Sequence, residues 1–234
     1  LWQSFVTAFS TKRRISMYLL FDLDGTLTDS QLGITRSVDH ALTTVMNIKT
    51  EDLSTLTDYI GPPLIESFQK FHNADLETSR KCVKTYRERY EKIGLLELEV
   101  YKGIKEMLET LHKAGFKLVV ATSKPEVFAR QILKNVNLAH YFETICGATL
   151  DGKIDTKDEV IAEVLNRITD LDKDNCFMIG DRKHDIEGAK KHNIKGIGVL
   201  WGFGTKKELE NAGAYKLFEN PEELTNWIIS KKDC

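Results

Sequence analysis

Short, predominantly apolar runs recur along the chain from residue 17 onward. Five of them are Tyr18–Phe21, Lys117–Ala121, Thr144–Cys146, Cys176–Ile179 and Ile197–Leu200. A continuous apolar run of this length is typical of a strand that is buried on both faces, as in a parallel sheet. We therefore predict that these runs form the strands of one parallel sheet.

Amphipathic stretches with helical spacing separate the apolar runs. One stripe recurs at i, i+3, i+4 and i+7, and consists of Ile104, Met107, Leu108 and Leu111. Gly115 then follows as a helix C-cap signal, and Pro125 is placed to open the next helix at its first position. Another stripe consists of Val160, Ile161, Val164, Leu165 and Ile168. Repeated strand–helix units predict an α/β fold with a Rossmann-like parallel sheet flanked by helices.

The interval between residues 31 and 96 shows no strand pattern. It contains three helical stripes, of which the last runs from Cys82 to Ile93. An insert of about seventy residues is too long for an ordinary crossover between strands. We predict an inserted helical cap domain over residues 31–96, with the α/β core formed by residues 17–30 and 97–234.

The first sixteen residues differ from the rest of the chain. Their apolar residues have helical spacing, and the basic residues 12–14 follow them. A secretory signal has the opposite order, with its basic residues first. Met17 directly precedes the first apolar run, so we interpret residues 1–16 as a leader or an upstream extension. A membrane-anchoring helix is the less favoured alternative.

The composition is that of an ordinary soluble globular protein. The 234 residues include 33 lysines and arginines against 35 aspartates and glutamates, a formal net charge of -2. This balance argues against a strongly basic nucleic-acid binder. No run of 18 apolar residues is present, so we expect no membrane span and no membrane partner. The four cysteines form no C-x-x-C pair, which favours a reducing, cytoplasmic location.

Two aspartates follow the first apolar run. Asp22 and Asp24 stand two residues apart, and Gly25 then allows a sharp turn and a close approach to a ligand. A carboxylate at the carboxyl end of a buried strand lies where open α/β sheets bind ligands. Two carboxylates this close favour a divalent cation between them, and hard oxygen ligands favour Mg²⁺. An ordinary acidic turn is the alternative.

A second acidic pair follows the fourth run. Gly180 and Asp181 end the strand, and Asp185 comes four residues later, in the predicted first turn of a helix, where the helix dipole favours a carboxylate. Taken alone, Asp181 could be an ordinary loop residue, and Asp185 could be an ordinary charged residue at the N-terminus of a helix. Because both acidic motifs end neighbouring strands, we expect them to share one site.

A hydroxyl and a lysine complete the candidate chemistry. Thr122 and Ser123 end the second run just before a helix, an arrangement that can bind phosphate, with an N-cap role as the alternative. Lys153 and Lys157 are both available to neutralise phosphoryl charge, and their spacing does not decide between them.

The order of these motifs resembles the haloacid dehalogenase superfamily. Asp22-x-Asp24-Gly-Thr26, Thr122, a downstream lysine and Gly180-Asp181-x-x-x-Asp185 occur in that order within residues 17 to 230. The segments Ile60–Leu64 and Gly198–Gly204 also resemble the phosphoglycolate phosphatase-like branch. The resemblance implies a hydrolase core with a helical cap of the C1 type.

The same resemblance implies a role for each position. Asp22 is the expected nucleophile, which forms an aspartyl-phosphate, and Asp24 is the expected acid and base. The expected catalytic residues are Asp22, Asp24, Thr122 and Lys157, and the expected phosphate contacts are Thr122, Ser123, Lys157 and Gly25. Lys157 is preferred to Lys153 because Thr156 and Lys157 directly precede a helix, as in relatives. Mg²⁺ is expected to bind Asp22, the Asp24 carbonyl and Asp181, with Asp185 close by.

We therefore expect a Mg²⁺-dependent phosphatase that hydrolyses a small phosphate monoester, such as phosphoglycolate, a nucleotide or a sugar phosphate. A phosphomutase or a pyrophosphatase of the same superfamily is the alternative, and the intact motifs disfavour a non-catalytic binding module. A cap over the site excludes bulky phosphoproteins, so the expected partner is a small phosphorylated metabolite. The sequence leaves open whether the protein is a monomer or a dimer.

Overall fold

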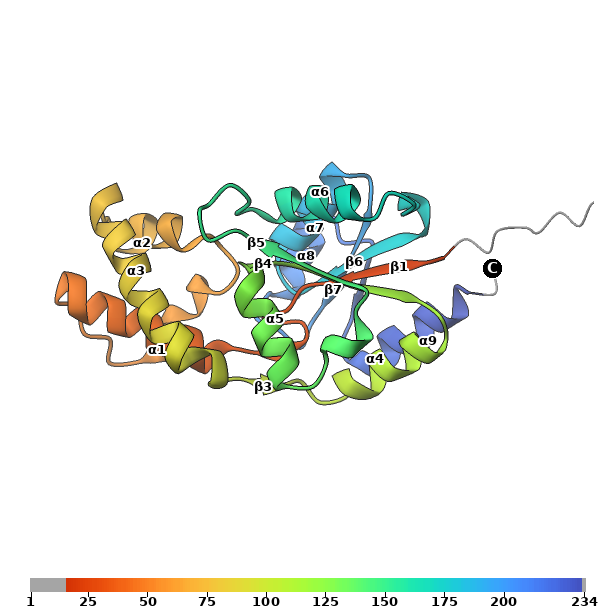
Figure 1. Cartoon of the computed structure of the whole chain (residues 1–234), viewed down its shortest axis with the longest axis horizontal. Helices are drawn as coiled ribbons and strands as arrows, with labels where there is room; N and C mark the ends of the chain where they lie inside the picture. The colour runs from red at the N-terminus through yellow and green to blue at the C-terminus, as the bar shows by residue number, and fades with distance from the viewer. Residues whose placement is uncertain (1–15, 233–234) are drawn as a thin grey trace, which may run out of the picture.

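The computed structural model describes residues 16–232 and contains a six-stranded parallel sheet with the strand order β5-β4-β1-β6-β7-β8 (Figure 1). The strands are β1 Tyr18–Phe21, β4 Lys117–Pro125, β5 Thr144–Ala148, β6 Cys176–Gly180, β7 Lys195–Val199 and β8 Lys216–Phe218. The predicted α/β fold is confirmed, and each of the five apolar runs lies in a strand, except that Leu200 follows the end of β7. The edge strand β8 was not predicted, because three residues beginning with an exposed lysine give no apolar run.

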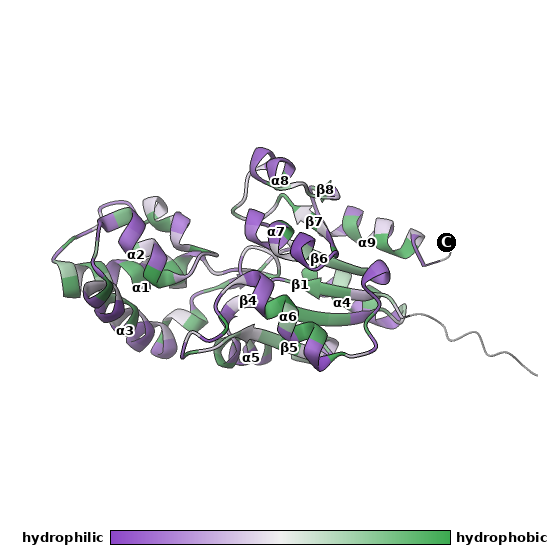
Figure 2. Ribbon diagram, turned by 90° about the horizontal axis from the view of Figure 1, so that it is seen from above, coloured by the Kyte–Doolittle hydropathy of each residue, from purple (hydrophilic) through white to green (hydrophobic). Residues whose placement is uncertain are grey.

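Helices cover both faces of the sheet. Along β1, Leu19 and Phe21 enter one hydrophobic cluster while Tyr18 and Leu20 enter another, as the alternation of a strand requires. The first face is covered by α4 Ile104–Lys113, α5 Glu126–Asn135 and α9 Pro221–Ser230, and the second by α6 Lys157–Arg167 and α7 Lys183–Lys191. Helix α8 Lys206–Ala212 packs beside α7. The strands form the hydrophobic centre of this three-layer core (Figure 2).

Two predicted helix boundaries are wrong. Pro125 does not occupy the first position of a helix: it ends β4, pairs with Ala148 and has an extended backbone (φ −51°, ψ 129°), so α5 begins at Glu126. Ile93 is 50% exposed and lies beyond the end of its helix at Lys92, so the apolar stripe stops at the fully buried Tyr90.

A helical insert lies beside the sheet (Figures 1 and 2). It contains α1 Gln31–Ala41, a π-helical turn Leu42–Met46, the 3₁₀ helix Leu53–Tyr59, α2 Leu64–His72, α3 Leu76–Lys92 and the 3₁₀ turn Gly94–Leu96. Further 3₁₀ turns, Ala139–Tyr141 and Lys173–Asn175, belong to the core. The inserted helical cap is therefore confirmed as part of the fold.

A short antiparallel ribbon joins the insert to the core. Strand β2 Thr28–Asp29 pairs with β3 Glu99–Val100, at the places where the chain leaves and re-enters the core. This ribbon was missed, because a two-residue strand is too short to show a period. The division at residues 30 and 97 stays a prediction, and residues 1–15 of the predicted leader lie outside the described part of the chain. Within residues 16–232, no helix is both long and apolar enough to cross a bilayer.

Candidate active site

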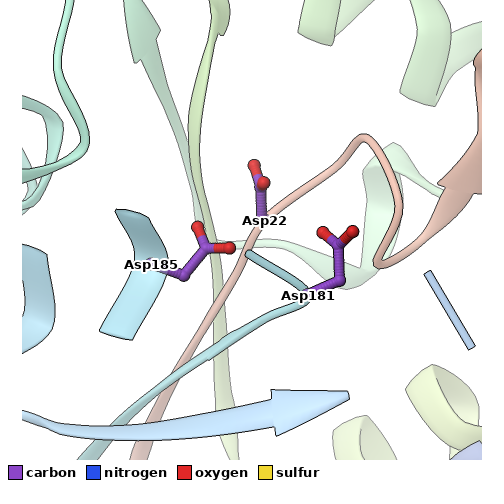
Figure 3. A group of neighbouring side chains, drawn as sticks. All are labelled: Asp22, Asp181 and Asp185. Atoms are coloured by element: carbon purple, nitrogen blue, oxygen red, sulfur yellow. The ribbon is translucent and has the colours of Figure 1, made fainter. Parts of the chain in front are cut away.

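The carboxyl ends of neighbouring strands bring the two acidic motifs together. Strands β1 and β6 are paired in the sheet, so Asp22, which follows β1, lies beside Asp181, which follows β6. Asp185 reaches the same place from the first turn of α7. The three buried carboxylates converge (Figure 3), and each offers an oxygen that lies within 4.8 Å of the others.

Two glycines make this close approach possible. Gly25 has φ +80°, and a Cβ there would lie 2.2 Å from Oδ2 of Asp181. A Cβ on Gly180 would lie 2.1 Å from Cγ of Asp185. Any side chain at either position would displace an aspartate, because real Cβ atoms do not approach other heavy atoms so closely.

Hydrogen bonds hold the two later aspartates in place. Asp181 accepts from the Thr26 hydroxyl at 3.3 Å through Oδ1 and from the Phe203 backbone N–H at 2.8 Å through Oδ2. Asp185 accepts from the backbone N–H of Arg182 at 3.0 Å. The segment 198–204, singled out in the sequence, therefore helps to orient Asp181.

The structure brings Lys157 to the acidic cluster and leaves Lys153 outside it. Lys157 is the first residue of α6 and is buried, with Nζ 2.8 Å from Oδ1 of Asp22 and 2.8 Å from Oδ1 of Asp185. Its ammonium also donates to the backbone carbonyl of Ala121 at 3.0 Å. Lys153 is exposed and pairs with Asp151 at 2.9 Å.

The cluster carries more negative than positive charge. Burial, together with the neighbouring Asp185 and Asp22, raises the pKa of Asp181 well above its usual value. Burial also raises the pKa of Asp185 to about 6, although Lys157 opposes the rise. Burial alone would lower the pKa of Lys157, but the carboxylates of Asp185 and Asp22 raise it above its usual value. The site therefore holds three carboxylates and one ammonium. The carboxylate oxygens are hard donors, and their excess negative charge suits a small divalent cation.

Asp24 has a different environment. Its Oδ2 lies 2.8 Å from Nζ of Lys124, while its Oδ1 is buried and has no hydrogen-bond partner among the described residues. Lys124 is itself only 8% exposed, and its backbone N–H donates to the hydroxyl of the buried Thr122 at 3.2 Å. Sequence reasoning missed Lys124, and the available signal was a lysine two residues beyond Thr122 at the end of a buried strand.

A cavity of about 520 Å³ separates this site from the cap. On the core side it is lined by Asp22, Asp24, Thr122, Ser123 and Lys124, and on the cap side by residues of α3 that include Arg80, Lys84, Arg87 and Tyr90. Two arginines connect the cap with the core: Arg87 donates to the carbonyl of Leu150 at 3.1 Å, and Arg182 donates to that of Ile60 at 2.8 Å. The cap therefore closes over the carboxylates and faces them with both basic and aromatic side chains.

Named relatives share most of the chain. A 5'-nucleotidase from Pseudomonas aeruginosa is 45% identical over 191 residues, which cover 82% of this chain and 86% of that protein. The tyrosine-protein kinase PtkA of Mycobacterium tuberculosis is 38% identical over 187 residues, 80% of this chain but only 62% of that protein. A phosphoglycolate phosphatase from Colwellia psychrerythraea is 30% identical over 227 residues, 92% of this chain and 96% of that protein.

The solved structures and the family comparison agree. The crystal structure of a predicted phosphatase from Clostridium acetobutylicum superposes with a TM-score of 0.89 and 46% identity, and the match covers 92% of this chain and 99% of that one. The family model described as haloacid dehalogenase-like hydrolase matches residues 19–199, which contain all four motifs. On these matches and on the convergence of its aspartates, the chain belongs to the haloacid dehalogenase-like hydrolase family.

Proposed function

We propose that this protein is a Mg²⁺-dependent phosphatase that hydrolyses a small phosphate monoester through an aspartyl-phosphate on Asp22. One observation carries the proposal: the carboxylate of Asp22 lines the cavity under the cap and pairs with Lys157 at 2.8 Å. A carboxylate held beside a buried ammonium can attack a phosphoryl group whose charge the ammonium helps to neutralise. The names of two relatives, 5'-nucleotidase and phosphoglycolate phosphatase, support the same reaction.

The proposed reaction has two chemical steps. In the first, a carboxylate oxygen of Asp22 bonds to phosphorus while the bond from phosphorus to the leaving oxygen breaks, and Asp24 gives its proton to that oxygen. In the second, Asp24 takes a proton from water, whose oxygen attacks the phosphoryl group and frees Asp22. Oδ1 of Asp24, buried beside the cavity with no hydrogen-bond partner among the described residues, is suited to this exchange. Thr122 and Ser123 line the same cavity and are the proposed phosphate contacts.

The acidic cluster fits Mg²⁺. The proposed ligands are the carboxylates of Asp22 and Asp181, with Asp185 beside them. The main-chain carbonyl of Asp24 is proposed as a further ligand. Burial, together with the neighbouring carboxylates, raises the pKa values of Asp181 and Asp185, and a bound cation would offset both effects because it favours the ionised carboxylates. When bound, the ion supplies positive charge for the phosphoryl oxygens.

A nucleoside 5′-monophosphate is the substrate class that we favour. The cavity of about 520 Å³ is of the size that holds drug-sized ligands and exceeds the need of a two-carbon ester. The 45% identical relative is named 5'-nucleotidase. Phosphoglycolate and sugar phosphates are the competing esters.

The test is phosphate release from a panel of nucleoside monophosphates, sugar phosphates, phosphoglycolate and pyrophosphate, with Mg²⁺ present. We expect the highest kcat/KM for a nucleoside monophosphate and no release by Asp22→Asn. A preference for phosphoglycolate would contradict the substrate class alone. Isomerisation of a sugar phosphate without phosphate release would show a phosphomutase and overturn the proposed reaction.

A further inference from the structure

A buried chain of three polar groups links the cap to Asp24. Nζ of Lys124 lies 2.8 Å from Oδ2 of Asp24 and donates to the hydroxyl of Tyr90 at 2.6 Å. The side chains of Lys124 and Asp24 are 4% and 11% exposed, and Tyr90 is 1% exposed. Tyr90 belongs to α3 of the cap, whereas the other two residues belong to the core.

The local backbone aims Lys124 at Asp24. The pairing of β4 with β5 shifts between Thr122 and Pro125, so Ser123 and Lys124 are extra residues in the ladder. Such a bulge redirects side chains, and bulges are frequent beside active sites. A Cβ on Gly147 of the neighbouring strand would lie 2.5 Å from the carbonyl oxygen of Lys124, so a glycine there is needed for this backbone path.

Aromatic packing holds Tyr90, the cap residue of these three polar groups. The ring of Tyr90 stacks on that of Tyr86 at 5.2 Å and 12°, and tilts against that of Phe128 at 5.8 Å. Phe128 lies on α5 of the core, so Tyr90 is held by both sides of the cap–core junction. Its hydroxyl therefore has a defined position only when α3 is seated against the core.

We propose that Tyr90 and Lys124 are positioning residues for the general acid, acting through Asp24. Lys124 holds Oδ2, which leaves Oδ1 as the oxygen that faces the leaving group, and Tyr90 holds Lys124 once the cap is closed. The proposal rests on the proposed function of Asp24. It assigns to the cap a part in aligning the acid, in addition to enclosing the substrate.

The decisive readout is the dependence on the leaving group. An alkyl phosphate needs protonation of its leaving oxygen, whereas p-nitrophenyl phosphate expels a stable phenolate. We expect Tyr90→Phe, which removes one hydroxyl, to lower kcat/KM about tenfold for an alkyl phosphate and less than about threefold for p-nitrophenyl phosphate. Tyr141→Phe is the control, since it removes one hydroxyl from a buried tyrosine of the core that does not line the cavity, and both rates should stay near wild type.

A double-mutant cycle separates positioning from loss of packing. If Tyr90 acts through Asp24, Tyr90→Phe should have no further effect on alkyl turnover in an Asp24→Asn protein. Lys124→Met should show the same selectivity with a larger loss, on the order of a hundredfold for the alkyl ester. Thermal melting of each variant checks that the protein is folded.

Equal losses for both esters, or additive losses in the cycle, would overturn the positioning role and leave the proposed phosphatase standing. Selective and non-additive losses would support it. Absence of phosphate release by the wild type, or normal turnover by Asp22→Asn, would instead overturn the proposed function and this inference with it.

Discussion

Asp22→Asn tests the proposed nucleophile with the smallest change in shape. The amide keeps the size of the side chain but removes the anionic oxygen that would bond to phosphorus. Loss of a covalent nucleophile typically costs several orders of magnitude in turnover. We expect kcat to fall by about 10³-fold or more for every phosphate ester.

The same change should leave folding stability almost unaltered. At an effective dielectric constant of about 20, Asp22 repels each of the two neighbouring carboxylates, within 4.8 Å, by about 3.5 kcal/mol when both are ionised. Its attraction to Lys157 at 2.8 Å is about 6 kcal/mol on the same scale. Removing the charge loses one attraction and relieves the repulsion from whichever of Asp181 and Asp185 is ionised, so the opposing energies offset each other to within a few kcal/mol. We expect the metal-free variant at pH 8 to keep its free energy of unfolding within about 2 kcal/mol of wild type.

The assay pairs phosphate release with urea unfolding on the same preparations. Asp174→Asn is a suitable control, because it makes the same chemical change at an exposed position of the core, in the 3₁₀ turn Lys173–Asn175. Wild-type protein quenched during turnover should carry one phosphoryl group by mass spectrometry, and Asp22→Asn should carry none. Turnover above a tenth of wild type in Asp22→Asn would refute the covalent route, and unfolding of the variant would refute the charge balance.

Three further outcomes are expected. Mg²⁺ should raise the melting temperature more at pH 8 than at pH 5. The pKa of Asp185 is raised to about 6 in the folded protein, so the stability of the metal-free protein falls as the pH rises through that value, and the cation should restore it. An equal rise in melting temperature at both pH values would contradict this. EDTA should abolish phosphate release, and activity after exhaustive chelation would exclude the metal requirement. Lys157→Met should lower kcat at least a hundredfold while Lys153→Met stays near wild type, and equal effects would argue against the assignment of Lys157.

Local sequence patterns predicted the elements that are long and buried. Each apolar run became a strand because its residues are covered on both faces, and the acidic motifs were recognisable because both follow such strands. The ribbon of β2 and β3 and the edge strand β8 were missed, since segments of two or three residues owe their conformation to the surrounding structure. Pro125 was misassigned because its fixed φ suits an extended strand end as well as a helix start.

The contact between Tyr90 and Lys124 shows a different limit. The two residues are 34 positions apart and belong to different parts of the fold. Tyr90 reads in the sequence as one member of an apolar helical stripe, and Lys124 as one lysine among many. Only the seating of α3 against β4 brings the hydroxyl to the ammonium. Interactions across the cap–core junction therefore could not be derived from spacing along the chain.

Asp22 and Asp24, the two aspartates of the first motif, are paired with different lysines and therefore lie in different electrostatic environments. Asp22 lies among further carboxylates and shares Lys157 with Asp185, so its site has unsatisfied negative charge that suits a cation. Asp24 lies outside that group and has Lys124 as its own partner, which occupies one oxygen and leaves the other without a hydrogen bond among the described residues. A nucleophile and an acid need such a difference, because one must face phosphorus beside positive charge and the other must exchange a proton. In the proposed mechanism, two chemically identical side chains two positions apart thus take separate tasks from the partners that the surrounding strands and helices supply.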